Sequence, residues 1–515
     1  MIFTGKMTRK KGIMCDKPFK CIWMVGVMAI TLILMAPSAE AAIYSGGAGT
    51  EADPYRIGIA ADWQTLAATT GDWDKYFVLI GDIDFGGAVL GQVGTFFVHF
   101  AGVFNGNGHV LQNGQVHPSG TGNTGVFGFL DTSGTIRNLG VKSVAVMGNF
   151  YTGGLVGVNQ GTITSCYTTG TVTGDVSDEY IGGLVGQNWD GTITSCYATG
   201  MVTGGTSSRN IGGLTGYNYI GTVTSCHATG RVVCGESSEN IGGLIGYNGG
   251  TVNASFALGS VAGSLFIGGL VGCNDHGTIT TCYAAGAVTG SNYTGGLTGS
   301  NSGGTVTLCY AMGAVAGNEL VGGLLGTNYG VVTTCYAKGP VTGVTYVGGL
   351  MGRNWYGMVE SCYAAGAVTG EEYVGGLVGD NEVIEVVSSY WDMETSGQPT
   401  SDGGEGRTTD EMTYPYEDNT YVDWNFSNVW TADVGNAING GYPYLLGNVP
   451  PLYHPADVNK DFHLVLGETI AYLTGWQQGD NPMAYAIRAA YLWQNGERYF
   501  YNEEEVPPMC WILTP

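Results

Sequence analysis

The feature that most constrains the fold of this chain is a short motif, G-G-L-x-G-x-N, which recurs at nearly equal intervals. Successive copies are separated by 26 to 30 residues, and a worn copy precedes them at residues 124–128. A fixed period of this size is typical of a solenoid, in which each unit stacks on its neighbour. The nine full copies begin at Gly153, Gly182, Gly212, Gly242, Gly268, Gly295, Gly322, Gly348 and Gly375.

Each repeat contains β-prone runs and no segment suited to a helix. Residues 161–174, for example, read GTITSCYTTGTVTG. Three such runs and three corners per repeat fit one rung of a parallel β-helix, with rungs about 4.8 Å apart. We therefore predict an all-β fold, a right-handed parallel β-helix (solenoid) with an N-terminal cap and a small α-helical C-terminal module.

Two residue types of the motif should form columns along the stack. The motif leucine should lie inside the solenoid, and the motif asparagine should sit at a corner, where its amide reaches the same amide one rung away. We favour this structural ladder over a ligand-binding role. The asparagines are Asn159, Asn188, Asn218, Asn248, Asn274, Asn301, Asn328, Asn354 and Asn381.

Cysteine forms a third column. We interpret its members as buried thiols packed as small apolar groups, because Ser255 and Ser389 take the same place in other repeats. Disulfides between adjacent rungs are the alternative. Cys234, Cys273 and Cys510 fall outside the pattern. The column members are Cys166, Cys196, Cys226, Cys282, Cys309, Cys335 and Cys362.

The N-terminus predicts export. Six basic residues precede an apolar stretch, Cys21 to Ala36, and a small-x-small cleavage site follows at residues 39–41. The alternative is an uncleaved anchor. We expect a secreted or cell-surface protein with no membrane span after cleavage. The mature chain would have 12 basic and 40 acidic residues, a net charge of −28, which argues against a nucleic-acid partner. We divide the chain into a signal peptide (1–41), an N-terminal cap with the first β-helix strands (42–122), the repeats (123–390), a C-terminal cap (391–450) and a tail (451–515).

The tail has the residue spacing of a calcium loop. Oxygen ligands on alternate residues, with an acidic residue at position twelve, suit Ca²⁺. Phe462 stands where the loop normally has glycine, and a polar helix start is the alternative. The tail thus looks like a dockerin-like or EF-hand-like module, with a cohesin-like or envelope partner. The metal ligands would be Asp457, Asn459, Asp461, the carbonyl of His463, and Glu468.

The repeat unit, G-G-L-x-G-x-N followed by C-Y-A-x-G, resembles the GLUG motif of secreted and surface bacterial proteins. The resemblance covers roughly residues 125–381. It implies a β-helical, extracellular and often adhesive role. Some large family members are metallopeptidases, but their H-E-x-x-H zinc motif is absent from this sequence.

The sequence favours binding over catalysis. Its seven histidines are scattered, and the repeats carry few basic residues to complete a catalytic cluster. We expect a non-enzymatic adhesin or scaffold that binds glycan or protein; the alternative is a polysaccharide lyase or hydrolase. Two surfaces are candidates. One is the longer corners at residues 175–180, 205–210 and 235–240. The other comprises aromatic residues that follow the ladder asparagines, namely Trp189, Tyr219, Tyr329, Trp355 and Tyr356.

Overall fold

The computed structural model describes residues 44–117, 122–382, 385–450, 464, 466–478, 483–495, 499–501 and 511–513. These residues all belong to one compact unit, Ile43–Pro515. The predicted signal peptide lies outside them. Among the described helices, none is both long enough and apolar enough to span a bilayer.

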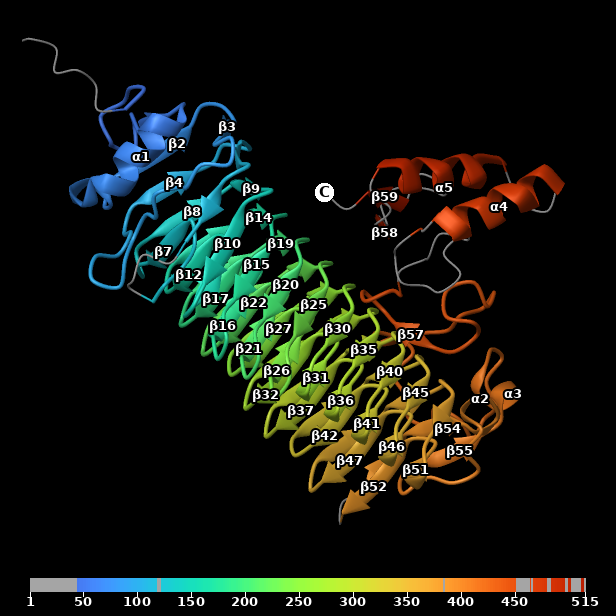
Figure 1. Cartoon of the computed structure of the whole chain (residues 1–515). Coiled ribbons are helices and arrows are strands. Elements are labelled where there is room, and N and C mark those ends of the chain that lie inside the picture. Colours follow the sequence, from blue (N-terminus) through green and yellow to red (C-terminus); the bar gives the residue numbers. More distant parts are fainter. Residues whose placement is uncertain are drawn as a thin grey trace, which may run out of the picture. The chain divides into compact units, whose positions relative to one another are not determined.

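The repeats form a right-handed parallel β-solenoid, which confirms the predicted fold class (Figure 1). Strands at equivalent places in successive repeats pair in parallel and build five sheets, here named A to E. One rung passes through sheets D, A, B, C and E in turn. Its strands are β12 (Val156–Asn159), β13 (Thr162–Thr164), β14 (Tyr167–Thr168), β15 (Val172–Gly174) and β16 (Glu179–Gly182).

The prediction of three strands per rung was wrong, because each rung has five. The run T-I-T-S-C-Y is split by its serine, as at Ser165, whose φ of 53° turns the chain between sheets A and B. A further strand, in sheet E, forms just before each Gly-Gly pair, where the sequence varies. Its backbone is held by pairing with neighbouring rungs, so it carries little sequence signal.

Sheets A, B and C form the part of the solenoid that does not carry the site described below. Sheet A contains β1 Tyr55–Ile57, β2 Tyr76–Leu79, β4 Val103–Asn105, β8 Thr135–Arg137, β13, β18 Thr192–Thr194, β23 Thr222–Thr224, β28 Thr251–Asn253, β33 Thr278–Thr280, β38 Thr305–Thr307, β43 Val331–Thr333, β48 Met358–Glu360 and β53 Val386–Val387. Sheet B contains β3 Ile83–Asp84, β5 Val110–Gln112, β9 Gly140–Lys142, β14, β19 Tyr197–Ala198, β24 His227–Ala228, β29 Phe256–Ala257, β34 Tyr283–Ala284, β39 Tyr310–Ala311, β44 Tyr336–Ala337, β49 Tyr363–Ala364, β54 Tyr390–Asp392 and β55 Glu405–Arg407. Sheet C contains β6 Gln115–Val116, β10 Ala145–Gly148, β15, β20 Val202–Gly204, β25 Val232–Cys234, β30 Val261–Ala262, β35 Val288–Thr289, β40 Val315–Ala316, β45 Val341–Thr342 and β50 Val368–Thr369.

The other two sheets, D and E, carry the site. Sheet D contains β7 Phe127–Leu130, β12, β17 Val185–Asn188, β22 Thr215–Asn218, β27 Ile245–Asn248, β32 Val271–Asp275, β37 Thr298–Ser302, β42 Leu325–Asn328, β47 Met351–Trp355 and β52 Val378–Glu382. Sheet E contains β11 Thr152–Gly153, β16, β21 Arg209–Gly212, β26 Glu239–Gly242, β31 Leu265–Gly268, β36 Asn292–Gly295, β41 Glu319–Gly322, β46 Thr345–Gly348 and β51 Glu372–Gly375.

The motif leucines fill the interior, and all nine are fully buried. The Gly-Gly pair before each leucine is needed because the backbones there are too close for a side chain. A Cβ on Gly182 would lie 1.9 Å from the Val185 carbonyl oxygen, and one on Gly183 would lie 2.1 Å from the Gly213 oxygen. The glycines therefore permit the tight corner between sheets E and D.

The cysteine column is buried, and every cysteine in the described residues is a free thiol. The Cys166 amide donates to the Cys196 sulfur at 3.3 Å, and this thiol donates to the Thr194 carbonyl at 3.2 Å. Ser255 replaces a thiol with the same geometry, since its hydroxyl accepts from the Cys226 amide at 3.1 Å. Burial raises the pKa of the Cys282 thiol well above its usual value. The column is thus inert packing.

Both ends of the solenoid are covered. The helix α1 (Ala60–Ala68), followed by the short 3-10 helix η1 (Thr70–Asp72), places Trp63 in the core at the first rungs. At the other end, Ser401 accepts hydrogen bonds from the amides of Leu377 and Val378. The cap also includes α2 (Met393–Ser396), α3 (Thr409–Met412) and the hairpin of β56 (Trp430–Thr431) with β57 (Tyr444–Leu445).

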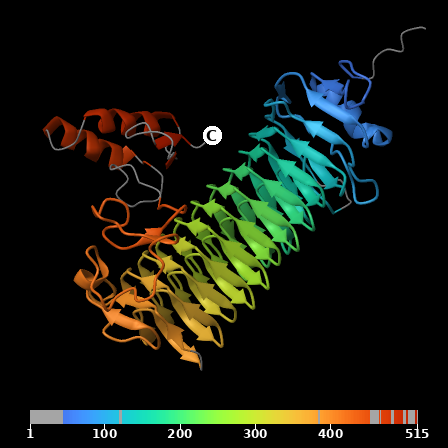
Figure 2. The ribbon, with the colours of Figure 1, turned by 180° about the vertical axis from the view of Figure 1, so that it is seen from behind.

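The C-terminal cap also covers part of sheet B, which bears an aromatic column. Tyr310, Tyr336 and Tyr363 of this column are buried against cap residues 412–445. The Tyr363 hydroxyl donates to the Pro443 carbonyl at 2.8 Å. Figure 2 shows this segment from behind.

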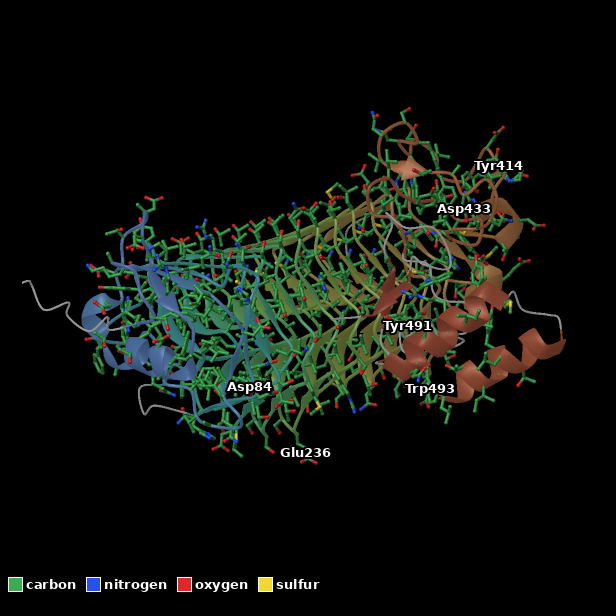
Figure 3. All side chains as sticks on the ribbon, turned by 90° about the horizontal axis from the view of Figure 1, so that it is seen from above. Asp84, Glu236, Tyr414, Asp433, Tyr491 and Trp493 are labelled. Atoms are coloured by element: carbon green, nitrogen blue, oxygen red, sulfur yellow. The ribbon has the colours of Figure 1, made fainter. Side chains whose placement is uncertain are left out.

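The tail contains the predicted helices, α4 (Leu466–Gln478) and α5 (Met483–Asn495). They contact one another, and a short antiparallel pair follows, β58 (Tyr499–Tyr501) with β59 (Trp511–Leu513). Figure 3 labels Tyr491 and Trp493 on α5.

Candidate ligand-binding face

The motif asparagines are joined into one continuous ladder. Asn159 Nδ2 donates to Asn188 Oδ1 at 2.7 Å, and the same bond repeats at 2.7–3.0 Å up to Asn381. The amide groups of Asn188 to Asn354 also donate to a glycine carbonyl in their own rung, such as Asn188 to Gly191 at 2.9 Å. Asn159 to Asn354 are completely buried. The amides are fully engaged in the scaffold, which leaves them no group to offer a ligand.

The proposed calcium loop cannot be placed. Asp457, Asn459, Asp461 and His463 lie outside the described residues, as does the side chain of Glu468. Within the part of the chain that is described, no cluster of three or more His, Cys, Asp or Glu side chains is arranged to hold a metal ion. The calcium prediction therefore stays a prediction.

The longer corners lie between sheets C and E and are partly buried. Glu236 is exposed and labelled in Figure 3, whereas Asp178, Ser208 and Ser238 point inward and are buried. Burial raises the pKa of Asp178 to about 7. Its carboxylate accepts one hydrogen bond, from the Thr152 hydroxyl at 3.2 Å. The longer corners, predicted as a candidate binding surface, are therefore only partly exposed.

The last two residues of each of these corners lie on a surface formed by sheets D and E. The floor of this surface is formed by the side chains that precede the ladder asparagines, together with Phe129, which pairs with the first of them; these side chains alternate with the buried positions and face outward. We call it the outer column of sheet D. In chain order it comprises Phe129, Val158, Gln187, Tyr217, Tyr247, Cys273, Ser300, Thr327, Arg353 and Asp380.

One wall of this surface is a row of residues with positive φ, which we call the left-handed column. Tyr180 has φ of 67° and Asn210 of 57°, a conformation in which the chain bends between corner and strand. The bend turns these side chains over the outer column of sheet D. The left-handed column comprises Tyr151, Tyr180, Asn210, Asn240, Phe266, Tyr293, Leu320, Tyr346 and Tyr373.

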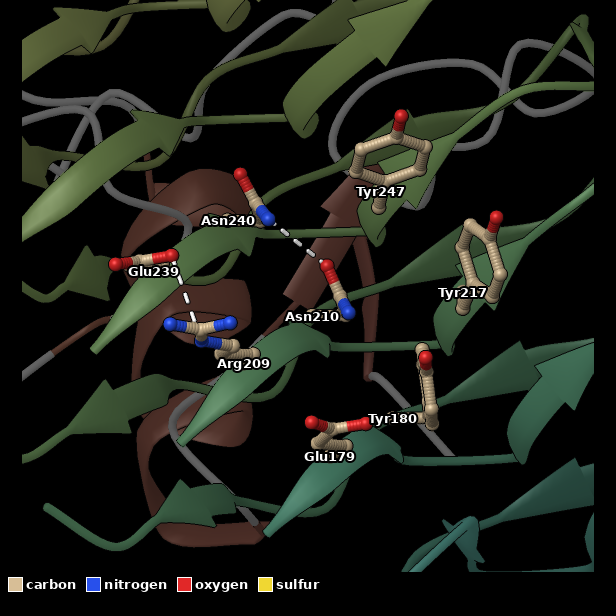
Figure 4. A pocket seen from close by; sticks show the side chains of 8 residues that line it. All are labelled: Glu179, Tyr180, Arg209, Asn210, Tyr217, Glu239, Asn240 and Tyr247. Carbon is tan, nitrogen blue, oxygen red and sulfur yellow. Dashed lines mark hydrogen bonds and ion pairs between the residues drawn. The ribbon is translucent and has the colours of Figure 1, made fainter. Parts of the chain in front are cut away.

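A cavity of about 250 Å³, here named the polar pocket, opens where the longer corners end. Figure 4 shows tyrosine rings on one side, two asparagines in the middle and charged side chains on the other. Asn240 Nδ2 donates to Asn210 Oδ1 at 2.9 Å, and Arg209 Nε lies 3.5 Å from a Glu239 carboxylate oxygen. Its lining residues are Glu179, Tyr180, Arg209, Asn210, Tyr217, Glu239, Asn240 and Tyr247.

The tyrosines of the polar pocket are held in place by their neighbours. The Tyr180 ring centroid lies 5.2 Å from that of Tyr217, which lies 5.1 Å from that of Tyr247. The Tyr247 hydroxyl donates to the Asp275 carboxylate. Burial, reinforced by the charge of Glu179, raises the pKa of Tyr180 to about 12. At neutral pH these phenols are therefore uncharged hydrogen-bonding groups attached to flat apolar rings.

A second cavity of about 250 Å³, the aromatic pocket, lies on the same face toward the N-terminus. The His99 ring stacks on Phe129 at 3.6 Å and lies 3.1 Å from the Asp131 carboxylate. Its lining residues are Phe96, His99, Asn123, Phe129, Tyr151, Val158, Gln160, Gln187 and Trp189. A larger cavity of about 350 Å³ lies over sheet A, away from this face.

The predicted aromatic surface proves to border this face. Trp189, Tyr219, Tyr329 and Tyr356 are exposed, and Trp355 is half-buried. Of these, Trp189 lines a pocket. Sequence reasoning missed the outer column of sheet D, although its position between the motif glycine and asparagine was the available signal. It also missed that the variable residues before Gly-Gly form a wall.

The comparisons with known proteins agree with this repeat architecture. The model of the GLUG motif matches residues 148–173, 177–203, 207–233, 263–289 and 343–369. This chain carries GLUG repeats. The second and third matched segments contribute Glu179, Tyr180, Arg209, Asn210 and Tyr217 to the polar pocket.

Two curated relatives match part of this chain. Halomucin of Haloquadratum walsbyi is 34% identical over 156 residues, which is 28% of this chain and 2% of halomucin. A protein of Evansella cellulosilytica, provisionally named a Gly-rich membrane protein, is 31% identical over 134 residues, 24% of this chain and 15% of the relative. This chain therefore spans a small fraction of either relative.

Among solved structures, a protein of Bacteroides ovatus provisionally named an immunoglobulin A1 protease matches with a TM-score of 0.30 and 18% identity. The match covers 78% of this chain and 95% of that protein. A likeness of this size carries no argument about the function of this chain.

Proposed function

We propose that this chain is an exported, non-enzymatic solenoid that binds glycan through the polar pocket, as an adhesin or surface scaffold. The observation that carries the proposal is the lining of this pocket. Tyrosine rings offer flat apolar faces, while amides, carboxylates and a guanidinium offer hydrogen bonds around them. A sugar ring has the matching pattern of C–H faces and peripheral hydroxyls.

A surface location is supported by two independent features. The N-terminal residues have the pattern of a secretory signal. The matched relatives are named as a mucin and as a membrane protein.

The tail supports an anchoring role in this proposal. Its residues Asp457 to Glu468 have calcium-loop spacing, so a Ca²⁺-dependent module would attach the solenoid to a cohesin-like or envelope partner. Calorimetry with Ca²⁺ on the full mature chain tests this step. Heat of binding that disappears in Asp457→Ala is the expected result, and identical traces for both proteins would contradict it.

A glycan array probed with the mature chain tests the main proposal. Tyr180→Ala should lose binding, because it removes one wall of the pocket. Tyr373→Ala is the matched control, since Tyr373 holds the same position in the left-handed column and stacks on Tyr346 at 4.7 Å, outside both pockets. Retained binding in Tyr180→Ala, or equal loss in both variants, would contradict the proposal.

The polysaccharide-cleaving alternative rests on two carboxylates in the same pocket. Glu179 and Glu239 lie on strands that both pair with the strand of Arg209. Their backbones are thus about 10 Å apart. Product release from any bound glycan, abolished in Glu179→Gln and Glu239→Gln, would replace the adhesin proposal with this one.

A further inference from the structure

We propose that the polar pocket and the aromatic pocket are two parts of one extended site, and that its ligand is a linear, uncharged glycan lying along the stacked strands. This inference rests on the proposed function and specifies its ligand class. It is carried by the continuity of the face, by the size of the cavities and by the charge around them.

The floor is continuous from one pocket to the other. Phe129, Val158, Gln187, Tyr217 and Tyr247 occupy successive strands of sheet D and are paired in register. The first three line the aromatic pocket and the last two line the polar pocket, so no strand intervenes. Four strand spacings give a floor of about 19 Å.

The wall is continuous as well. Tyr151, of the aromatic pocket, stacks on Tyr180, of the polar pocket, with ring centroids 5.0 Å apart and planes 6° from parallel. Tyr180 in turn lies against Tyr217. A chain of rings therefore crosses the boundary between the pockets, and a ligand could follow it without leaving aromatic surface.

The size of the cavities argues for a ligand that uses both. Each has a volume of about 250 Å³, below the roughly 300–1,000 Å³ typical of a site for a compact small molecule. Two adjoining cavities on a surface that repeats with every strand suit a polymer of repeating units. A polymer that occupies both cavities gains affinity, because it loses its translational and rotational freedom only once.

The charge selects an uncharged polymer. Glu179 and Glu239 face a single Arg209 in the polar pocket, and His99 in the aromatic pocket is paired with Asp131. The chain as a whole has a formal charge of −24. Acidic glycans and nucleic acids would be repelled.

A peptide ligand is less suited to this face. An extended peptide gains most of its affinity by adding a strand to an open sheet edge. The strands β12, β17 and β22 beneath the pockets are each paired on both sides, so their backbone groups are already used. Recognition here must come from side chains alone, as it does for sugar rings.

Calorimetry with neutral linear oligosaccharides of increasing length tests the inference. The probes are di-, tetra- and hexasaccharides of β-linked glucose and of N-acetylglucosamine, added to the mature full chain. We expect affinity to rise about tenfold or more from the disaccharide to the hexasaccharide, as the second pocket is engaged. Trp189→Ala should reduce hexasaccharide affinity by more than it reduces disaccharide affinity, because Trp189 lines the aromatic pocket that only the longer ligand reaches in addition to the polar pocket.

Tyr329→Ala is the matched control, because Tyr329 also follows a ladder asparagine and, like Trp189, is 45% exposed, yet lines neither pocket. Affinity that is flat with length, or an equal effect of Trp189→Ala on every length, would overturn the extended site while leaving the proposed function intact. Binding of acidic polysaccharides or of peptides in place of neutral glycans would also overturn it. If the wild-type chain bound no glycan at all, the proposed function itself would be contradicted.

Discussion

The first three full rungs and the later rungs share one scaffold but have different surfaces. The early rungs have four-residue corners between sheets C and E, such as residues 175–178, whereas a later rung has only Gly290 and Ser291. The strands on either side keep their register, since Glu239 pairs with Arg209 before it and with Leu265 after it. Corner length therefore changes the surface without disturbing the core.

In one later rung the same face is filled by the protein itself. Arg353 of the outer column lies between the rings of Tyr346 and Trp355, at 5.0 and 3.9 Å from their centroids. Its guanidinium pairs with Asp380 and Glu382, both at 2.5 Å. The early rungs leave a pocket beside their aromatic rings, whereas this rung places an arginine between two of them.

The largest expected effect is a pH dependence that arises from one of the long corners. Asp178 is buried in a long corner, and the equivalent residues of the next two corners are Ser208 and Ser238. Its folded pKa of about 7 exceeds the unfolded value near 3.9, so its ionisation removes stability as pH rises from about 4 to 7. Asp178→Ser should raise the free energy of unfolding by about 2–4 kcal/mol above pH 7. Urea unfolding at several pH values measures this, and a gain of the same size at pH 4 would contradict it.

The next effect has the opposite pH dependence. His227 takes the tyrosine position in the sheet B column, between the rings of Tyr197 and Phe256. Burial lowers the pKa of His227 to about 4. The folded state therefore keeps its full stability above pH 6.5, where the ring is neutral, and loses stability as pH falls toward 4. His227→Tyr should restore about 3 kcal/mol at pH 4 and change little at pH 8. Acid unfolding monitored by circular dichroism tests this. Tyr197→Phe is the control, and its unfolding at low pH should match that of the wild-type chain.

The asparagine ladder should respond equally in the two regions. Asn218→Ala and Asn328→Ala each remove one ladder bond from both neighbouring amides, at a cost of about 2 kcal/mol. Asn381→Ala, at the end of the ladder, should cost about half as much, because only one ladder bond is lost. Denaturant midpoints of the three variants decide the matter. Unequal costs at Asn218 and Asn328 would mean that the ladder is not common to both regions.

The smallest expected effect concerns the arginine that fills the later face. Arg353→Ala should lower stability by about 1 kcal/mol, since the two carboxylates that lose their partner, Asp380 and Glu382, are 20% and 35% exposed and stay in contact with solvent. The variant should also acquire weak glycan binding, because the space between Tyr346 and Trp355 is vacated. Differential scanning calorimetry and the oligosaccharide titration measure the two effects, and unchanged binding would show that more than one column controls the site.

The core was predictable from the sequence because stacked interior positions require the same residue in every repeat. Leu214 and Asn218 recur in every copy, since each must match the residue above and below it. The candidate site was not predictable by the same logic. Glu179, Arg209 and Glu239 are stacked on one another but differ, because a solvent-facing position has no such constraint. The five-strand rung escaped prediction for a related reason: the sheet E strand is imposed by pairing and not by its own residues.

The asparagine ladder also has a direction along the stack. Every bond in it runs from the nitrogen of one amide to the oxygen of the next amide toward the C-terminus. Each bond polarises its neighbours in the same sense, so turning one amide around would set two oxygens and two nitrogens face to face. Each added rung therefore has one favoured orientation for its asparagine amide, set by the amide already in place.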